Sequence, residues 1–116
     1  MDKTEAKIQQ EIVTWFNNTY CLKHMDPREI IFHVANEGQQ RLAKIGVLGC
    51  VADLLFTWHG VMYFCEVKTP EGTQSPVQKD FEARVIKMGF SYFLVRSCCE
   101  FQKYVLSLPN VKQCNA

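Results

Sequence analysis

Three charged residues on two strand-like runs could carry out chemistry together. Asp53 lies on the run 52–58, and Glu66 and Lys68 lie on the run 61–68. Two facing carboxylates repel each other, so they need a shared proton, a cation or solvent. Their neighbours are apolar, which argues against full solvation. Hard oxygen ligands beside an ammonium group suit Mg²⁺, with the lysine as partner of an anion or of a nucleophilic water. An ion, an anion and a water together are typical of phosphodiester hydrolysis.

The expected closeness of these residues depends on a hairpin. Both runs are rich in β-branched and aromatic residues, and His59-Gly60 between them suits a two-residue loop. That loop would place Asp53 directly opposite Glu66, with Cβ atoms about 4.5–5.5 Å apart. Lys68, two residues further on, would point to the same face.

The length and composition predict a single soluble domain over residues 1–116. Apolar residues make up 47% and charged residues 22%, and the net charge is +1. This charge excludes a histone-like, purely electrostatic nucleic-acid binder, but not a site that uses an ion and a few basic residues. No signal peptide or membrane-spanning run is visible, so we expect an intracellular protein.

The six cysteines invite a disulfide or zinc interpretation. They form no C-x-x-C pair, and Cys65 falls inside a predicted strand. Cys21 and His24 have a metal-like spacing, but no second matching pair exists. We therefore expect free thiols in a reducing compartment.

A first helix is predicted over residues 3–24. Its apolar stripe repeats at intervals of three and four residues and consists of Ile8, Ile12, Trp15, Phe16 and Tyr20. Glu5 extends this stripe toward the N-terminus. It could close a capping box with Asp2 or serve a metal site, and its spacing alone leaves both open.

A short strand is predicted over residues 30–34, followed by a polar, basic segment. Asn36-Glu37-Gly38 ends the strand, and the segment runs to Gly49 as a short helix or a loop. Arg41 and Lys44 in this segment fit a solvated face. They could alternatively meet phosphates, because they flank the approach to Asp53.

The second half of the chain predicts a helix, a strand and a last helix. Ser75-Pro76-x-Gln78 starts the helix with a capping box, and Gly89 ends it. The apolar stripe of this helix consists of Val77, Phe81, Val85 and Met88. Gln78 is explained as a cap, yet it could also face the Glu66 end of the hairpin. A strand over residues 91–95 and a capping box at 97–100 follow. The strand–helix–strand unit from Glu66 should be parallel, giving a mixed α/β sheet with helices on both faces.

Together these residues resemble a known group, the PD-(D/E)XK nucleases. The resemblance is carried by Asp53 and by Glu66-Val67-Lys68 on the next strand. A wider set is similar to the virus-type replication-repair nuclease (VRR-NUC) domain of that superfamily, and it covers residues 4 to 107. This set consists of Asn36-Glu37-Gly38, Asp53-Leu54, Phe64 to Lys68, Gly72, Ser75-Pro76-x-Gln78, Gly89 and Val95-Arg96-Ser97.

The resemblance implies a restriction-endonuclease-like fold, with an α-β-β-β-α-β core plus a C-terminal helix, and a role for each matching residue. Asp53 and Glu66 would bind Mg²⁺ or Mn²⁺, with the Val67 carbonyl as a further ligand. Lys68 would position or activate the attacking water. Glu5 would complete the metal site, and Gln78 would lie beside it. The family's prolines before the first acid are replaced here by Gly49 to Ala52, which puts the conformation of that loop in doubt.

The resemblance also implies an activity. Stand-alone phage or bacterial members resemble Holliday-junction resolvases, which are homodimers that cut branched DNA, so we expect a structure-selective DNA endonuclease in a bacterial or phage-infected cytoplasm. One alternative is a non-catalytic DNA-binding module on the same fold. Another is a small interaction domain in which Asp53, Glu66 and Lys68 form a partly buried ion-pair triad.

Overall fold

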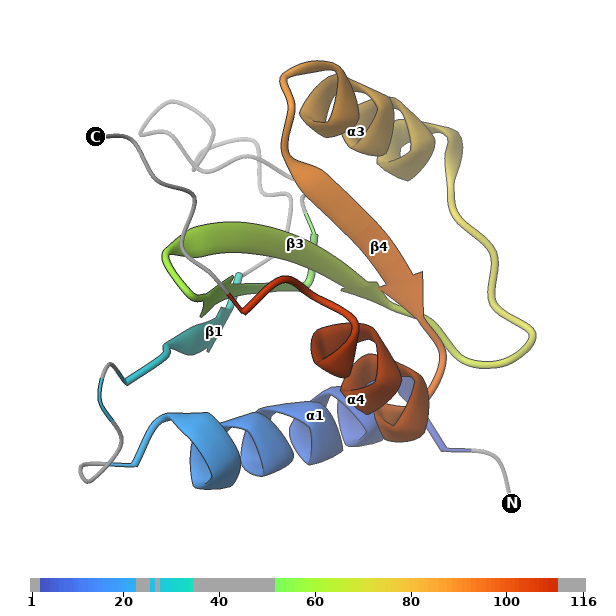
Figure 1. Ribbon diagram of the computed structural model, residues 1–116. Helices are drawn as coiled ribbons and strands as arrows, with labels where there is room; N and C mark the ends of the chain where they lie inside the picture. Colours follow the sequence, from blue (N-terminus) through green and yellow to red (C-terminus); the bar gives the residue numbers. More distant parts are fainter. Residues whose placement is uncertain (1–2, 23–25, 27, 35–51, 111–116) are drawn as a thin grey trace, which may run out of the picture.

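The structure is a computed structural model that describes residues 3–22, 26, 28–34 and 52–110. Figure 1 shows helices packed on both sides of a curved, twisted sheet. The elements in chain order are α1 (Glu5–Tyr20), β1 (Ile31–His33), β2 (Leu54–Trp58), β3 (Val61–Val67), α3 (Pro76–Lys87), β4 (Ser91–Val95) and α4 (Cys98–Leu106). This order confirms the predicted α/β architecture. The segment with Arg41 and Lys44 and the run from Gly49 to Val51 lie outside the described residues.

The four strands form one mixed sheet in the order β1-β2-β3-β4. β1, β2 and β3 are joined by antiparallel pairings, whereas β3 and β4 run parallel. The parallel pair requires a crossover, which α3 supplies. The predicted strand–helix–strand unit is therefore confirmed.

The hairpin of β2 and β3 has the register that the two-residue loop predicts. Trp58 pairs with Val61, and the ladder continues to Leu54 opposite Cys65. His59 and Gly60 both adopt positive φ, at 50° and 85°. These angles are the ones a two-residue turn of this kind needs, and glycine adopts them without strain. One step beyond the ladder, the same register brings Asp53 opposite Glu66.

The two faces of the sheet carry different cores. α1 and α4 lie together on one face and α3 lies on the other (Figure 1). On the first face, Ile12 and Phe16 of α1 and Phe101 of α4 are fully buried against Leu54 and Phe56 of β2. The second core is smaller and consists of Ala52, Val85 and Tyr92, with Phe64 and Phe81 packed against it. Glu66 and Lys68 are two and four residues after Phe64, so their side chains point to the same face of the sheet, the one that α3 covers.

Helix ends differ from the prediction in three places. The first helix, predicted over residues 3–24, already ends at Tyr20. α1 begins at Glu5 with Thr4 as its N-cap, and the Thr4 hydroxyl accepts a hydrogen bond from the Lys7 N–H at 3.1 Å. The capping box of Asp2 and Glu5 is therefore wrong, because Glu5 is the first helical residue rather than the third. At α4, the Glu100 carboxylate reaches past the Ser97 cap and accepts from the Arg96 N–H at 2.6 Å.

α3 is less buried than its apolar spacing predicts. Its capping box forms as expected, with both hydrogen bonds between Ser75 and Gln78 present, and Gly89 follows the helix with a φ of 95°. Val85 is buried, but Val77 and Met88 at the two ends are 57% and 72% exposed. The contribution of α3 to the second core comes from Val85, with Phe81 packed against it. None of the described helices is long and apolar enough to cross a membrane.

Candidate active site at the open end of the hairpin

Asp53, Glu66 and Lys68 come together at the end of the hairpin opposite its turn. The Lys68 ammonium lies 3.6 Å from Glu66 Oε2, and both side chains are almost fully buried. Asp53 Oδ2 accepts a hydrogen bond of 2.7 Å from the backbone N–H of Val67, the residue between them. The Asp53 carboxylate is thereby drawn across to the β3 strand, next to the other two groups.

Glu66 is the most buried acid in the described structure, at 1% exposure. Its Oε1 atom accepts two hydrogen bonds, from the Tyr92 hydroxyl at 2.6 Å and from the Gln74 amide at 2.9 Å. The same Gln74 nitrogen donates to Glu82 Oε1 at 3.0 Å. A carboxylate is an acceptor only, so the two contacts orient the amide with its NH₂ group between Glu66 and Glu82.

Burial and the local negative charge keep two neighbouring groups protonated, the Tyr92 hydroxyl and the Cys65 thiol. The pKa of Tyr92 is raised far above its ordinary value by burial, by its hydrogen bond to Glu66, and by the charges of Glu66, Glu82 and Asp53. The pKa of Cys65, which is fully buried, is raised well above the usual thiol value by burial and then by the charges of Asp53 and Glu66. Tyr92 is therefore a donor at any working pH, and Cys65 supplies no thiolate.

A single arginine fixes the loop between Lys68 and α3. One terminal nitrogen of the Arg96 guanidinium donates to the carbonyls of Thr69, Pro70 and Gly72 at 2.7, 3.2 and 2.6 Å. The loop also closes on itself, because the Gly72 N–H donates to the Thr69 carbonyl at 3.0 Å. The loop from Lys68 to Gln74 is thus held by the Arg96 side chain and by its own backbone hydrogen bond.

The other two predicted site residues, Gln78 and Glu5, both lie at the start of a helix. Gln78 uses its side-chain oxygen to accept from the Ser75 N–H at 2.8 Å, so it is engaged in the cap of α3. Glu5 is exposed in the first turn of α1. It belongs to no group of three or more His, Cys, Asp or Glu side chains that could hold an ion, and the described residues contain no such group.

Three residues of the site were missed by reasoning from the sequence: Gln74, Glu82 and Tyr92. Gln74 stands in a loop, where no periodicity predicts the direction of a side chain. Tyr92 could have been found, because a parallel β4 beside β3 puts it opposite Phe64 on the α3 face. Glu82 is one position after Phe81 and looks like an ordinary polar helix residue.

The residues present fit a divalent ion with oxygen ligands. Glu66 Oε2 is a buried oxygen that finds no hydrogen-bond donor among the described residues. Such an orphan acceptor is costly unless something else satisfies it. Asp53 and Glu66 could hold Mg²⁺ or Mn²⁺ together with the Val67 carbonyl and water. This suits Mg²⁺, which is usually bound through one or two carboxylates and keeps several waters.

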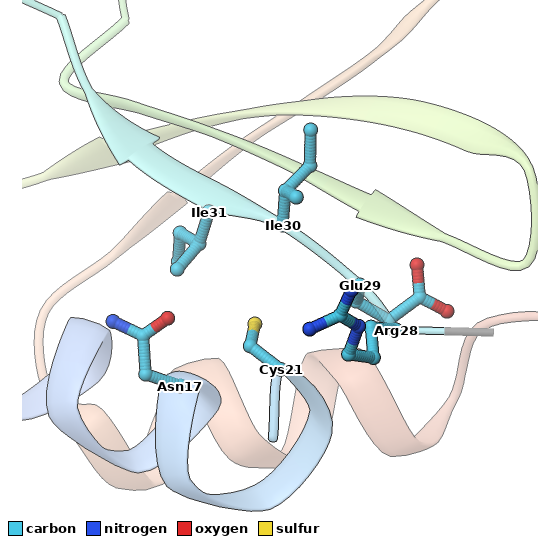
Figure 2. A pocket seen from close by; sticks show the side chains of 6 residues that line it. All are labelled: Asn17, Cys21, Arg28, Glu29, Ile30 and Ile31. Atoms are coloured by element: carbon cyan, nitrogen blue, oxygen red, sulfur yellow. The ribbon is translucent and has the colours of Figure 1, made fainter. Parts of the chain in front are cut away.

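Away from these residues, a hollow of about 390 Å³ lies between the end of α1 and the residues leading into β1 (Figure 2). In Figure 2 the Ile31 side chain points toward Asn17 and Cys21 of this hollow, whereas Ile30 points away from it. Glu29 is buried there, but its carboxylate accepts from the Thr57 hydroxyl at 2.7 Å and from the His59 N–H at 3.0 Å. Burial and the Glu29 charge raise the pKa of the Cys21 thiol. This hollow therefore presents neither an uncommitted acid nor an activated thiol.

The cysteines of the described residues behave as free thiols. Cys21, Cys65, Cys98 and Cys99 form no disulfide. Cys50, Cys114 and the His24 of the suggested zinc spacing lie outside the described residues.

Comparisons with known proteins agree with the geometry at the level of the fold. No family model and no curated protein matches the sequence. Among solved structures, the chain is similar to a "VRR_NUC domain protein", with a TM-score of 0.72 and 18% identity over 97% of this chain and 98% of that one. The fold implied by the sequence resemblance is thus confirmed across nearly the entire chain.

Proposed function

We propose that this protein is a Mg²⁺- or Mn²⁺-dependent nuclease that hydrolyses DNA phosphodiester bonds. The proposal depends on one observation above all: a buried glutamate oxygen without a hydrogen-bond donor faces a buried lysine on the fold of a VRR_NUC domain protein. That fold supports a nuclease-type domain. The Lys68 ammonium lies at ion-pair distance from this oxygen but too far for a hydrogen bond, so Oε2 keeps an open acceptor position that a purely structural ion-pair triad would be expected to fill.

Each residue then has a definite task. Asp53 and Glu66 hold the ion, and the hydrogen bond from the Val67 N–H fixes Asp53 for this purpose. Lys68 is held against Glu66 by its charge, and its ammonium steadies the attacking water and the negative charge that grows on the phosphate. The chemistry that a bound Mg²⁺ or Mn²⁺ supplies is charge neutralisation at the phosphate and a lower pKa for a coordinated water.

The finer assignment is a branched DNA substrate, such as a four-way junction, cut by a homodimer in a bacterial or phage-infected cytoplasm. It rests on the sequence resemblance and on a symmetry argument, because cutting two strands of a junction requires two sites. Glu5 and Gln78 are proposed as outer participants only. Glu5 would have to act from the exposed first turn of α1, and Gln78 would act by holding the start of α3.

The decisive experiment compares Lys68→Ala with Lys103→Ala, a matched change on the exposed side of α4. Both proteins are incubated with four-way, flapped and linear DNA in Mg²⁺, in Mn²⁺ and in EDTA. We expect Lys68→Ala to fold and bind DNA while cleavage falls by about 10² to 10⁴, the loss expected when one preorganised charge is removed. Lys103→Ala should cleave normally.

Three outcomes would contradict parts of the proposal. Normal cleavage by Lys68→Ala would remove the lysine from the mechanism. Binding without cleavage by the wild type in either ion would indicate a non-catalytic DNA-binding module. A wild type that sediments as a monomer at assay concentration would exclude paired cutting of a junction and leave flap or nick cleavage.

A further inference from the structure

The two oxygens of the Glu66 carboxylate have very different surroundings. Oε1 is committed to the protein, because it accepts from the Tyr92 hydroxyl at 2.6 Å and the Gln74 amide at 2.9 Å. Oε2 has no hydrogen-bond donor among the described residues, and its neighbour is the Lys68 ammonium at 3.6 Å. A carboxylate in water has no such asymmetry. The protein imposes it.

The two donors on Oε1 are themselves held in place. Gln74 is fixed from the other side by Glu82, which takes the second hydrogen of its amide at 3.0 Å. Tyr92 is 7% exposed, and its ring packs edge-on against Phe81 at 6.0 Å between centroids. Rotating the Glu66 carboxylate to present both oxygens outward would break two hydrogen bonds in a dry environment, which is costly.

We propose that Tyr92 and Gln74 are positioning residues that leave only Oε2 of Glu66 available to a divalent ion and thereby make the site select Mg²⁺ and Mn²⁺ over Ca²⁺. This inference rests on the proposed function. Its physical basis is the difference between the ions. Mg²⁺ requires a near-ideal octahedron of short bonds and takes carboxylates together with water. Ca²⁺ is larger, takes six to eight oxygens and accepts a carboxylate through both of its oxygens.

The binding of ions to the DNA-free protein tests this directly. Mn²⁺ affinity is measured by electron paramagnetic resonance of the free ion, and Ca²⁺ affinity by competition against Mn²⁺. We expect Tyr92→Phe, Gln74→Leu and their combination to lower the Mn²⁺-to-Ca²⁺ affinity ratio. The fall should be on the order of tenfold for a single change, since partners of metal ligands typically contribute 10- to 100-fold in affinity. Glu66 freed from Oε1 donors can then bind Ca²⁺ through both oxygens.

The matched control is Tyr63→Phe, which changes a buried tyrosine on β3, the strand of Glu66. Tyr63 belongs to the core on the other face of the sheet. Its affinity ratio should equal that of the wild type. An unchanged ratio in Tyr92→Phe and in the double variant, whether or not both affinities fall together, would overturn the inference. Thermal melts of all variants separate this result from unfolding.

The experiment also separates the inference from the proposed function beneath it. A wild type that prefers Mn²⁺ and cleaves DNA, with variants of equal preference, would refute the roles of Tyr92 and Gln74 alone. A wild type that binds neither ion would refute the proposed metal-dependent activity, and the selectivity with it.

Discussion

At the scale of single residues, Tyr92 carries the strongest electrostatic consequence. Its hydroxyl is buried, donates to Glu66, and lies within the field of three carboxylates, so its pKa is raised. The folded protein therefore keeps the proton at a pH where the unfolded chain, with a tyrosine pKa near 10, gives it up. The neutral hydroxyl contributes stability that is fully present below about pH 10 and is lost above it.

We predict that the stability of the wild type falls more steeply between pH 8 and pH 11 than that of Tyr92→Phe. The measurement is the urea midpoint at each pH for both proteins. Tyr63→Phe is the reference, because burial alone raises the pKa of Tyr63 and its effect on the slope should be smaller. Equal slopes for Tyr92→Phe and the wild type would show that the hydroxyl does not resist ionisation in the folded state.

Glu29 has a structural task at the other end of the hairpin. Its two oxygens hold the Thr57 hydroxyl and the His59 N–H, and the residue is 8% exposed. We predict that Glu29→Ala lowers the free energy of unfolding by about 2 kcal/mol, since hydrogen bonds to a charged group contribute roughly 1.5–3 kcal/mol each and relaxation recovers part of this.

The same variant should cleave DNA at the wild-type rate at temperatures well below its melting point. A denaturation curve and a cleavage assay on one preparation check both parts. A loss of cleavage without a loss of stability would place Glu29 in the active site, contrary to the structure.

At the scale of elements, the loop before α3 depends on Arg96. One guanidinium nitrogen holds three carbonyls of this loop, and the loop carries Gln74 to Glu66. We predict that Arg96→Met leaves the sheet intact but raises amide exchange at Gly72, whose N–H closes the loop, by at least about tenfold. Hydrogen exchange by NMR measures this.

Arg84→Met is the matched control, because Arg84 is exposed on α3 and pairs only with Asp80 among the described residues. In Arg84→Met, the Gly72 amide should exchange at the wild-type rate. Unchanged exchange in Arg96→Met would show that the loop is held by its own backbone and not by the guanidinium.

Elements with a strict period were predictable from the sequence, and side chains in loops were not. The hairpin register follows from the two-residue loop at His59-Gly60, which pairs Trp58 with Val61, and a one-residue slip would turn every buried side chain outward. The sequence predicts that Gln78 can lie near the site, whereas the glutamine that contacts Glu66 is Gln74. The capping pattern predicts only that Gln78 can turn back to Ser75, and nothing local predicts that Gln74 reaches two carboxylates.

The apolar stripes show the same limit at the level of packing. Spacing placed Val77 and Met88 on the buried side of α3, and both are exposed. The helical period predicts which side chains share a face of the helix. How many turns of that face are covered by the sheet depends on the tertiary structure. The ends of α1 and the register of α3 on the sheet were therefore less predictable than the presence of either helix.

At the scale of the whole molecule, the charge balance constrains how DNA can be held. The net charge is +1, and the candidate site is lined by the carboxylates of Asp53, Glu66 and Glu82 with one lysine nearby. A phosphate approaching this site without a divalent ion meets repulsion. Removing one negative charge should therefore help binding in the absence of metal, although the same change should abolish cleavage in its presence.

We predict that Asp53→Asn binds a labelled four-way junction more tightly than the wild type in EDTA, by roughly threefold to tenfold, as expected for one unit charge near a partly screened phosphate. The amide oxygen can still accept from the Val67 N–H, so the local structure should persist. Fluorescence anisotropy at low and high salt measures the affinities, and the difference should shrink as salt rises. Asp26→Asn, an exposed acid before β1, is the control and should change little. Weaker binding by Asp53→Asn in EDTA would mean that phosphates do not approach these carboxylates, which would contradict the proposed site.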